Sequence, residues 1–250
     1  MGNRHHVLRG GVIGCGYFAQ NHLNGWGEVE GAEIVVLCDR DSEALHQTAR
    51  FFGIERTYTD AEAMLAETDL DFVDVVTRVG SHRELVELAA AQKTHVICQK
   101  PFAPSVEDAR NMVVACIHSG VTLMVHENFR WQTPIRALKG VLTSGAIGTP
   151  FFGQISFRSA FDVYSNQPYL ATDDRFIVSD LGIHLLDLAR FLMGDVEQMY
   201  TRTQRVNTKI KGEDVATIIL DIEDGKTCVV DASYASRLEH EIFPQTLIRI

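Results

Sequence analysis

Apolar and polar residues alternate in two different ways along the chain, and the change comes near residue 150. From residue 8 to about 126, short runs rich in β-branched residues alternate with longer stretches of helical periodicity. This order is typical of βαβ units around a parallel sheet. It predicts a doubly wound α/β domain with strands near 8–13, 33–38, 72–77, 95–98 and 121–126.

Three helices between those strands carry capping signals. Ser, Asp or Asn at a helix start can accept hydrogen bonds from free N–H groups, and Gly after the last turn can adopt the left-handed conformation. The first helix is predicted to start at Ser42 and to end at Gly53. The second is predicted to start with a capping box of Ser81 and Glu84, and the third with a similar pair, Ser105 and Asp108, and to end at Gly120.

The second half shows strict alternation, as in antiparallel strands with one buried face. The segments are 151–160, 196–206, 214–223 and 227–236, with Asp224-Gly225 as a tight hairpin turn between the last two. One helix interrupts them, and its apolar stripe and stop residue are Leu181, Leu185, Leu188, Leu192 and Gly194. We therefore expect a Rossmann domain at 1–127 and an α+β domain with a mostly antiparallel sheet at 128–250.

Length and composition narrow the class of protein. At ~150 residues per domain, 250 residues fit one large or two modest domains. The net charge of −10 argues against a nucleic-acid surface or a polybasic membrane anchor. Five scattered cysteines without C-x-x-C spacing indicate neither a disulfide framework nor a zinc finger. The apolar stretch near the start is too short for a signal peptide, so we expect a cytoplasmic protein.

The segment GVIGCGYFAQNHL carries G-x-G-x-x-A at Gly14, Gly16 and Ala19, between the first strand and a helix. Gly14 would allow the tight turn, Gly16 the approach of a pyrophosphate, and Ala19 close helix–strand packing. The alternative is an ordinary glycine turn. Because strand, glycines and helix occur in order, we expect a dinucleotide site that includes the loop residues Tyr17 and Phe18.

Asp39 ends the second predicted strand, where a carboxylate can accept hydrogen bonds from the adenosine ribose. A carboxylate would repel a 2′-phosphate, so Asp39 favours NAD. Arg40 beside it could pair with such a phosphate, which leaves NADP open, or it is a solvated surface charge.

Three further segments carry a resemblance to a known family: TRVGSHRELVELAAAQKTHVICQKPFA (77–103), HENFRW (126–131) and DLGIHLLDLARFLMG (180–194). With the glycine motif, they make the whole chain resemble the Gfo/Idh/MocA oxidoreductases, the family of glucose–fructose oxidoreductase and inositol dehydrogenase. The resemblance implies hydride transfer between a nicotinamide cofactor and a secondary alcohol or ketone of a sugar or polyol. Family members usually continue well beyond the segment similar to FPQTLIRI, so the second domain is expected to be incomplete.

The resemblance implies a catalytic role for Lys100, which follows a strand of the parallel sheet and precedes Pro101. Carboxyl ends of such strands face the ligand crevice, although most lysines are solvated surface charges. The family's usual triplet is Glu-Lys-Pro, and here Gln99 replaces the glutamate. A neutral Gln99 can hydrogen-bond near the cofactor but cannot supply a negative charge.

Asp180 and His184 are four residues apart on the predicted helix and would share one face. A carboxylate beside an imidazole suits a general acid/base pair, and the resemblance places this pair beside the lysine at the substrate. Without the resemblance, a helix-capping Asp and a half-buried structural His would be the better interpretation. Asp187 is expected to be structural. Either Lys100 or His184 would take the hydroxyl proton.

The resemblance also implies that the segment after the strand at 121–126 lines the nicotinamide and substrate pocket. Asn128 would contact the cofactor, and Arg130 and Trp131 the substrate, unless Phe129 and Trp131 are simply interdomain core. Thr77 and His82 are expected near the cofactor, with a structural role in the first helical turn as the alternative for His82.

The remaining histidine and cysteine residues are weaker candidates for a functional site. His5-His6 and His240-Glu241 lack the spacing of a metal motif, so we expect no metal, and Cys15 has no histidine partner that would make it a nucleophile. A catalytically inactive dinucleotide-binding regulatory or scaffold protein is the alternative function, motivated by Gln99 and the short second domain. Association through the second sheet, common in the family, predicts a homo-oligomer.

Overall fold

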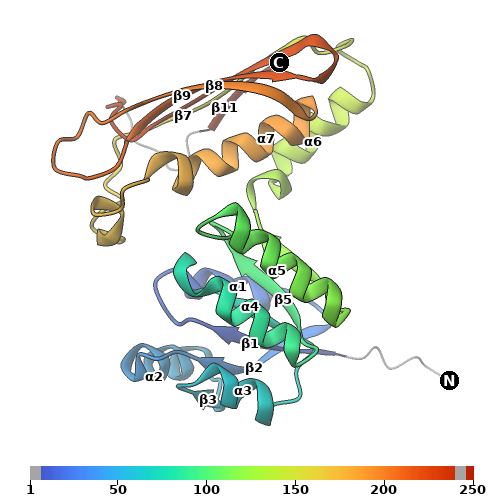
Figure 1. Ribbon diagram of the computed structural model, residues 1–250, viewed down its shortest axis with the longest axis vertical. Coiled ribbons are helices and arrows are strands. Elements are labelled where there is room, and N and C mark those ends of the chain that lie inside the picture. The colour runs from blue at the N-terminus through green and yellow to red at the C-terminus, as the bar shows by residue number, and fades with distance from the viewer. Residues whose placement is uncertain (1–6, 240–245) are drawn as a thin grey trace. The chain divides into compact units, whose positions relative to one another are not determined.

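A computed structural model describes residues 7–239 and 246–250 of the chain. His5, His6, His240 and Glu241 therefore lie outside the described residues. The chain forms two compact units, Met1–His126 and Glu127–Ile250, which we call the first and second unit (Figure 1).

The first unit is built on a six-stranded parallel sheet in the order β3-β2-β1-β4-β5-β6. The order reverses between β1 and β4, which makes a doubly wound fold with a switch point at the carboxyl ends of these strands. The prediction of this fold is confirmed, although the two-residue β3 was too short to be recognised. The strands are β1 (Leu8–Ile13), β2 (Ala32–Cys38), β3 (Thr57–Tyr58), β4 (Phe72–Val75), β5 (His95–Gln99) and β6 (Leu123–His126).

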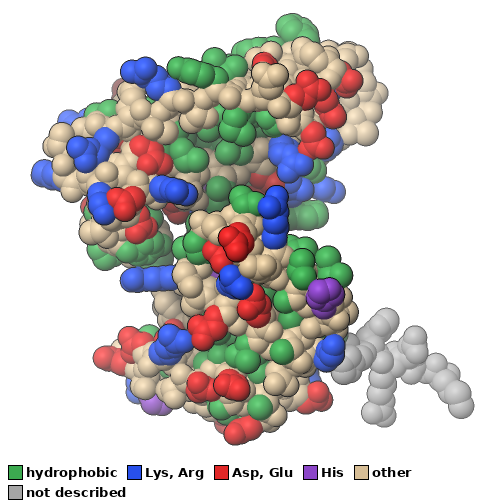
Figure 2. Space-filling model, in the orientation of Figure 1, with side chains coloured by type: hydrophobic (Ala, Val, Ile, Leu, Met, Phe, Trp, Pro, Cys, Tyr) green, Lys and Arg blue, Asp and Glu red, His purple; other side chains and the backbone are tan. Residues whose placement is uncertain are grey.

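Helices flank this sheet, and α4 packs beside α5 in Figure 1. Charged side chains of both signs are interspersed over the face of the first unit shown in Figure 2. The helices are α1 (Ala19–Gly27), α2 (Ser42–Phe52), α3 (Ala61–Glu67), α4 (His82–Ala91) and α5 (Val106–Ser119).

The capping predictions are partly confirmed. Ser105 accepts a hydrogen bond from the N–H of Asp108, and the glycines that end α2 and α5 have φ of 69° and 71°. The capping box at Ser81 is wrong, because a 3₁₀ turn at Val79–Ser81 leads into α4 and the Ser81 hydroxyl donates to Thr77 Oγ1 instead. Asp41, and not Ser42, caps α2 by accepting from two N–H groups of the first turn.

The second unit contains a five-stranded mixed sheet in the order β11-β7-β10-β9-β8. Among the described strands of this sheet, only β7 and β10 pair in parallel, so the sheet is mostly antiparallel as predicted. The expected hairpin joins β9 to β10, and its turn residues Asp224 and Gly225 have φ of 62° and 71°. The strands are β7 (Phe152–Arg158), β8 (Val196–Gln204), β9 (Val215–Ile222), β10 (Lys226–Ser233) and β11 (Thr246–Arg249).

Two helices, α6 (Thr133–Thr143) and α7 (Ile183–Met193), belong to this unit, and α7 packs on β7 and β10 (Figure 1). The predicted leucine stripe is buried in the core against strand residues such as Ile155 and Phe157. The helix runs on from residue 180 as predicted, but its first part, η4 (Val178–Gly182), is a π-helical turn that leads directly into α7. This turn carries Asp180, and its winding is wider than the α-helical spacing from which the prediction was made.

None of the helices in the described part of the chain combines the length and apolar character needed to cross a bilayer.

Candidate active site

The glycine loop between β1 and α1 has the shape that a dinucleotide needs. Gly14 has φ of 107°, and a Cβ there would lie 2.5 Å from the carbonyl oxygen of Val76, so only glycine fits. A Cβ on Gly16 would meet no protein atom within 4 Å, which leaves room above the loop for a ligand. Ala19 is fully buried and lets α1 pack closely on the sheet. The loop therefore fits the pyrophosphate of NAD.

Asp39 is held in place by the same loop. Its Oδ2 accepts a hydrogen bond of 2.6 Å from the N–H of Cys15, and its Oδ1 accepts one of 2.8 Å from the N–H of Asp41. Each oxygen keeps a second lone pair that could accept from a ribose hydroxyl. The Arg40 side chain is 83% exposed and 4.0 Å from Glu84, as a solvated charge would be.

The other loop side chains differ in exposure. Tyr17 is 61% exposed, and Phe18 is 39% exposed with its ring edge-on to His22. Cys15 is buried, and burial together with the charge of Asp39 raises the pKa of its thiol to about 12. A thiol in this state is a poor nucleophile at neutral pH.

His82 is buried within the first unit, and its ring nitrogens lie 3.0 Å from the carbonyl oxygen of Thr77 and 3.1 Å from that of Phe102. The ring thus connects the chain after β4 to the chain after β5. These two contacts favour the structural interpretation of His82 over direct contact with a cofactor. The Thr77 hydroxyl is in turn bound by Ser81.

Gln99 and Lys100 lie where β5 ends. The Gln99 side chain is buried, its Oε1 accepts a 2.6 Å hydrogen bond from the N–H of Lys100, and its Nε2 lies 2.8 Å from Nε2 of His22. His22 also contacts Asp74. His22 and Asp74 are not among the predicted site residues, although the charged residue within the apolar run FVDVV is a signal that identifies Asp74.

His184 lies at the start of α7 with Glu127 as its carboxylate partner. The distances from His184 Nδ1 to Oε1 and Oε2 of Glu127 are 2.8 Å and 2.7 Å. The Phe129 ring stacks on the imidazole at 4.1 Å with an angle of 6° between the planes. Helical spacing predicts Asp180 as the carboxylate that orients His184, and the structure places Glu127 on Nδ1. The signal for Glu127 was its place directly after a strand, in HENFRW.

Asp180 lies one turn earlier, within η4. Its N–H donates to the carbonyl oxygen of Phe176, and its charge, after burial, helps to raise the pKa of Tyr234. The Glu213 carboxylate holds the start of this turn by accepting 3.2 Å hydrogen bonds from the N–H groups of Phe176 and Val178.

Arg130 and Trp131 form the 3₁₀ turn after Asn128. The Arg130 guanidinium makes a two-pronged ion pair with Asp187 on α7, with Nε 2.7 Å from Oδ2. Asp187 thus has a structural partner. Trp131 is 66% exposed, whereas Phe129 is buried in the core of the second unit itself. Asn128 is exposed.

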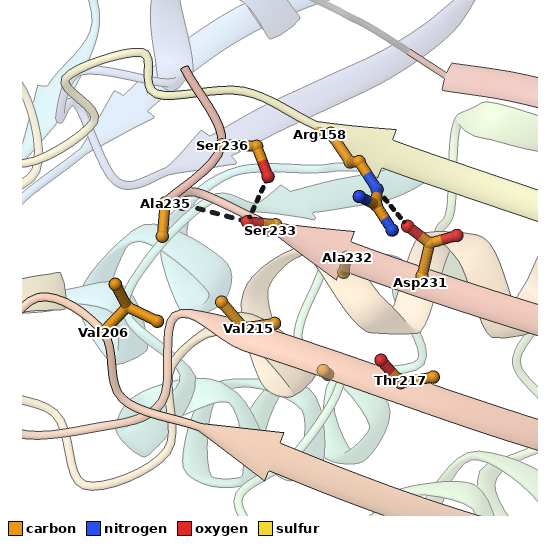
Figure 3. A pocket seen from close by; sticks show the side chains of 10 residues that line it. Arg158, Val206, Val215, Thr217, Asp231, Ala232, Ser233, Ala235 and Ser236 are labelled. Carbon is orange, nitrogen blue, oxygen red and sulfur yellow. Dashed lines mark hydrogen bonds and ion pairs between the residues drawn. The ribbon is translucent and has the colours of Figure 1, made fainter. Parts of the chain in front are cut away.

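A small cavity of about 200 Å³ opens on the second sheet, away from the residues named above. Figure 3 shows the Arg158 guanidinium facing Asp231 on a neighbouring strand, with Nε 2.6 Å from the carboxylate, and Ser233 bound by Ser236. Its charged groups already pair with one another. In the described residues, no three His, Cys, Asp or Glu side chains gather as a metal site.

Both units match models of one protein family. Residues 8–127 match the oxidoreductase family with an NAD-binding Rossmann fold, and residues 135–248 match the GFO/IDH/MocA C-terminal domain. The predictions of the family resemblance and of an NAD-binding first domain are confirmed.

Two proteins named D-apiose dehydrogenase are similar to 97% of the chain. The one from Paraburkholderia graminis is 61% identical over 243 residues, and the one from Rhizobium rhizogenes is 59% identical over the same number. The matches cover 65% and 70% of these relatives, so the chain spans about two thirds of their length.

A solved structure shows the same fold. It is a crystal structure of an oxidoreductase from Agrobacterium radiobacter in complex with NAD⁺, L-tartaric acid and magnesium. The TM-score is 0.95 at 59% identity, and the match covers 97% of this chain and 71% of that one.

Proposed function

Because the chain belongs to the Gfo/Idh/MocA family of oxidoreductases, we propose that it is an NAD-dependent dehydrogenase of a small sugar. The high identity to two D-apiose dehydrogenases supports D-apiose, or a sugar of similar size and hydroxyl pattern, as the substrate. This similarity is the observation that carries the proposal.

The first unit would hold the cofactor. The fixed glycine loop supports pyrophosphate binding at Gly14 and Gly16, and the Asp39 carboxylate supports ribose binding and a preference for NAD. Tyr17, Phe18, Thr77, Gln99 and Asn128 remain proposed neighbours of the cofactor, with Arg40 relevant only to NADP. When bound, the nicotinamide ring accepts a hydride from the carbinol carbon of the sugar.

The chain's own residues would hold the substrate and move its proton. Lys100 lies at the carboxyl end of β5, where ligands of parallel sheets bind. Either Lys100 in its neutral form or His184 would take the hydroxyl proton, and the other would donate a hydrogen bond to the substrate oxygen. The Glu127 carboxylate would stabilise the imidazolium that forms if His184 is the base.

Asp180, Arg130 and Trp131 are the further substrate residues in this proposal. Asp180 belongs to a π-helical turn, a feature frequent at functional sites. Arg130 would act through its position beside Asp187, since its guanidinium is already paired.

The alternative of an inactive regulatory protein loses support, because the similar curated relatives carry dehydrogenase names. It also leaves unexplained why Lys100 and the His184–Glu127 pair are present together.

We propose a homo-oligomer formed through the outer face of the second sheet. The strand register places Tyr200, Ile219 and Leu247 on the face opposite α7, where they are 65%, 42% and 61% exposed. Light scattering at micromolar concentration would show a dimer or larger species, and a stable monomer would contradict this. A cytoplasmic location is supported by the five cysteines, all free and buried.

The function is tested by adding NAD and a panel of sugars to the purified chain and following the absorbance of NADH. The panel is D-apiose, myo-inositol, levoglucosan and L-tartrate as a non-sugar control. We expect turnover with D-apiose above the others. NAD binding without turnover of any sugar would support the regulatory alternative.

A further inference from the structure

A buried chain of polar groups runs beneath the end of β5. The N–H of Lys100 donates to Gln99 Oε1 at 2.6 Å, Gln99 Nε2 lies 2.8 Å from His22 Nε2, and His22 Nδ1 lies 2.8 Å from Asp74 Oδ2. These groups come from three elements: Gln99 ends β5 and Lys100 follows it, His22 lies in α1, and Asp74 lies in β4. The chain links the backbone of Lys100 to a charge inside the sheet.

The direction of every hydrogen bond in this chain follows from chemistry. An ionised Asp74 can only accept, so His22 must carry a proton on Nδ1. A neutral His22 then presents Nε2 as an acceptor, and Gln99 must turn its NH₂ group toward it. Gln99 Oε1 therefore faces the N–H of Lys100, which can only donate. One tautomer of His22 and one orientation of Gln99 satisfy all three contacts.

Burying these polar side chains costs folding free energy, which suggests that the arrangement has a function. Asp74, His22 and Gln99 are 1%, 6% and 6% exposed. Asp74 Oδ2 receives a second hydrogen bond of 2.8 Å from the Trp26 indole, while Oδ1 has no hydrogen-bond partner. The other residues of β4 near Asp74 are apolar, so the strand does not need a carboxylate to pack in the sheet. A buried acceptor such as Asp74 Oδ1, which has no hydrogen-bond partner, calls for an explanation.

The surroundings of His22 favour a fixed ring. The His126 imidazole lies 4.2 Å away, centroid to centroid, and Phe18 approaches edge-on at 5.7 Å. Phe18 belongs to the glycine loop and His126 ends β6. The imidazole thus contacts two aromatic rings in addition to its two hydrogen bonds.

We propose that Asp74, His22 and Gln99 are positioning residues for Lys100: their directed hydrogen bonds fix the backbone from which the Lys100 side chain extends. The functional part rests on the proposed dehydrogenase activity. The chain also accounts for Gln in place of the family's usual Glu. A glutamate would accept from both sides and so require a second proton on His22, whereas Gln99 completes the chain with neutral His22.

The first test reads the protons directly and needs no turnover. In ¹⁵N-labelled protein, NMR of the imidazole nitrogens would show His22 protonated on Nδ1 and not on Nε2, with His22→Gln identifying its signals among ten histidines. Gln99→Glu, which keeps the side-chain size, would add the proton on Nε2. A proton on Nε2 in the unmodified protein, or unchanged signals in Gln99→Glu, would overturn the proposal.

The second test separates positioning from general stability. Gln99→Met removes both side-chain hydrogen bonds, so the Lys100 amide should exchange faster with solvent and kcat should fall roughly 10–100-fold at nearly unchanged KM. Gln99→Glu keeps an acceptor for the Lys100 amide and should retain much more activity. Trp26→Phe is the matched control, because it removes a hydrogen bond to Asp74 without interrupting the chain.

Equal losses of kcat in Gln99→Met and Trp26→Phe would contradict positioning. If the unmodified chain turns over no sugar, the proposed function fails. The His22 tautomer and the Lys100 amide exchange would still decide whether the hydrogen-bonded chain exists as described.

Discussion

The imidazole of His184 and the carboxylate of Glu127 form an acid/base pair in the second unit, with Nδ1 2.7 Å from Oε2. The contact fixes the ring through Nδ1, so Nε2 is the nitrogen that would accept a proton. Phe129 stacks on the same ring, so rotation is blocked on that side as well. A fixed imidazole with a charged partner is suited to accept a proton.

Glu127→Gln should lower kcat by about 10–100-fold, because a neutral amide stabilises an imidazolium less well. The loss should be largely contained in that of His184→Ala, since the two act as a unit. Asp231→Asn is a suitable control, because this carboxylate pairs with Arg158 and Ser156 instead. Strictly additive losses in the double variant would show that Glu127 does not act through His184.

The two glycines of the nucleotide loop should respond differently to alanine. Gly14→Ala places a Cβ against the Val76 carbonyl at a φ of 107° and should lower the free energy of unfolding by at least roughly 1–3 kcal/mol. Gly16→Ala meets no protein atom and should leave Tm nearly unchanged while weakening NAD binding. Calorimetry of unfolding and of NAD binding measures both. The reverse pattern would remove Gly16 from the cofactor site.

Asp39→Ala should reduce the preference for NAD over NADP. It also removes the acceptor of the Cys15 N–H, so the glycine loop should loosen and NAD itself should bind less tightly. Asp39→Asn keeps one acceptor oxygen and serves as the matched comparison. Equal affinities of the unmodified protein for NAD and NADP in titration calorimetry would contradict the assignment.

The thiols of Cys15 and Cys38 should resist alkylation by iodoacetamide at pH 8. Burial, with the nearby Asp39 charge, raises the pKa of each to about 12, and only the thiolate reacts quickly. Because the raised pKa favours the protonated form in the folded state, the free energy of unfolding should fall as pH rises above about 9. Mass spectrometry would detect labelling only after unfolding, and rapid labelling of the native protein would contradict this.

The sequence predicted the parts of the fold that depend on local patterns. The parallel sheet, the glycine loop and the leucine stripe follow from periodicity and from backbone requirements at single residues such as Gly14. The two-residue β3 and the π-helical turn before α7 leave no periodic trace, because each depends on tertiary contacts such as those from Glu213.

The candidate site was harder to predict because its pairs are distant in sequence. Asp180 was chosen as the partner of His184 from helical spacing, whereas Glu127 is 57 residues away. His22 and Gln99 are 77 residues apart and meet only because β5 and α1 lie in one unit. Helical spacing therefore identifies candidate residues but not which of them pair across elements.

Kinetics of Lys100→Ala and His184→Ala, paired with NAD titration, test whether Lys100 and His184 carry out the chemistry. Each variant should lower kcat for sugar oxidation by ~10²–10⁴ and leave the Kd of NAD nearly unchanged, because neither side chain is assigned to the pyrophosphate or the ribose. Full activity in either variant, or loss of NAD binding in place of loss of turnover, would show that other residues carry out the chemistry.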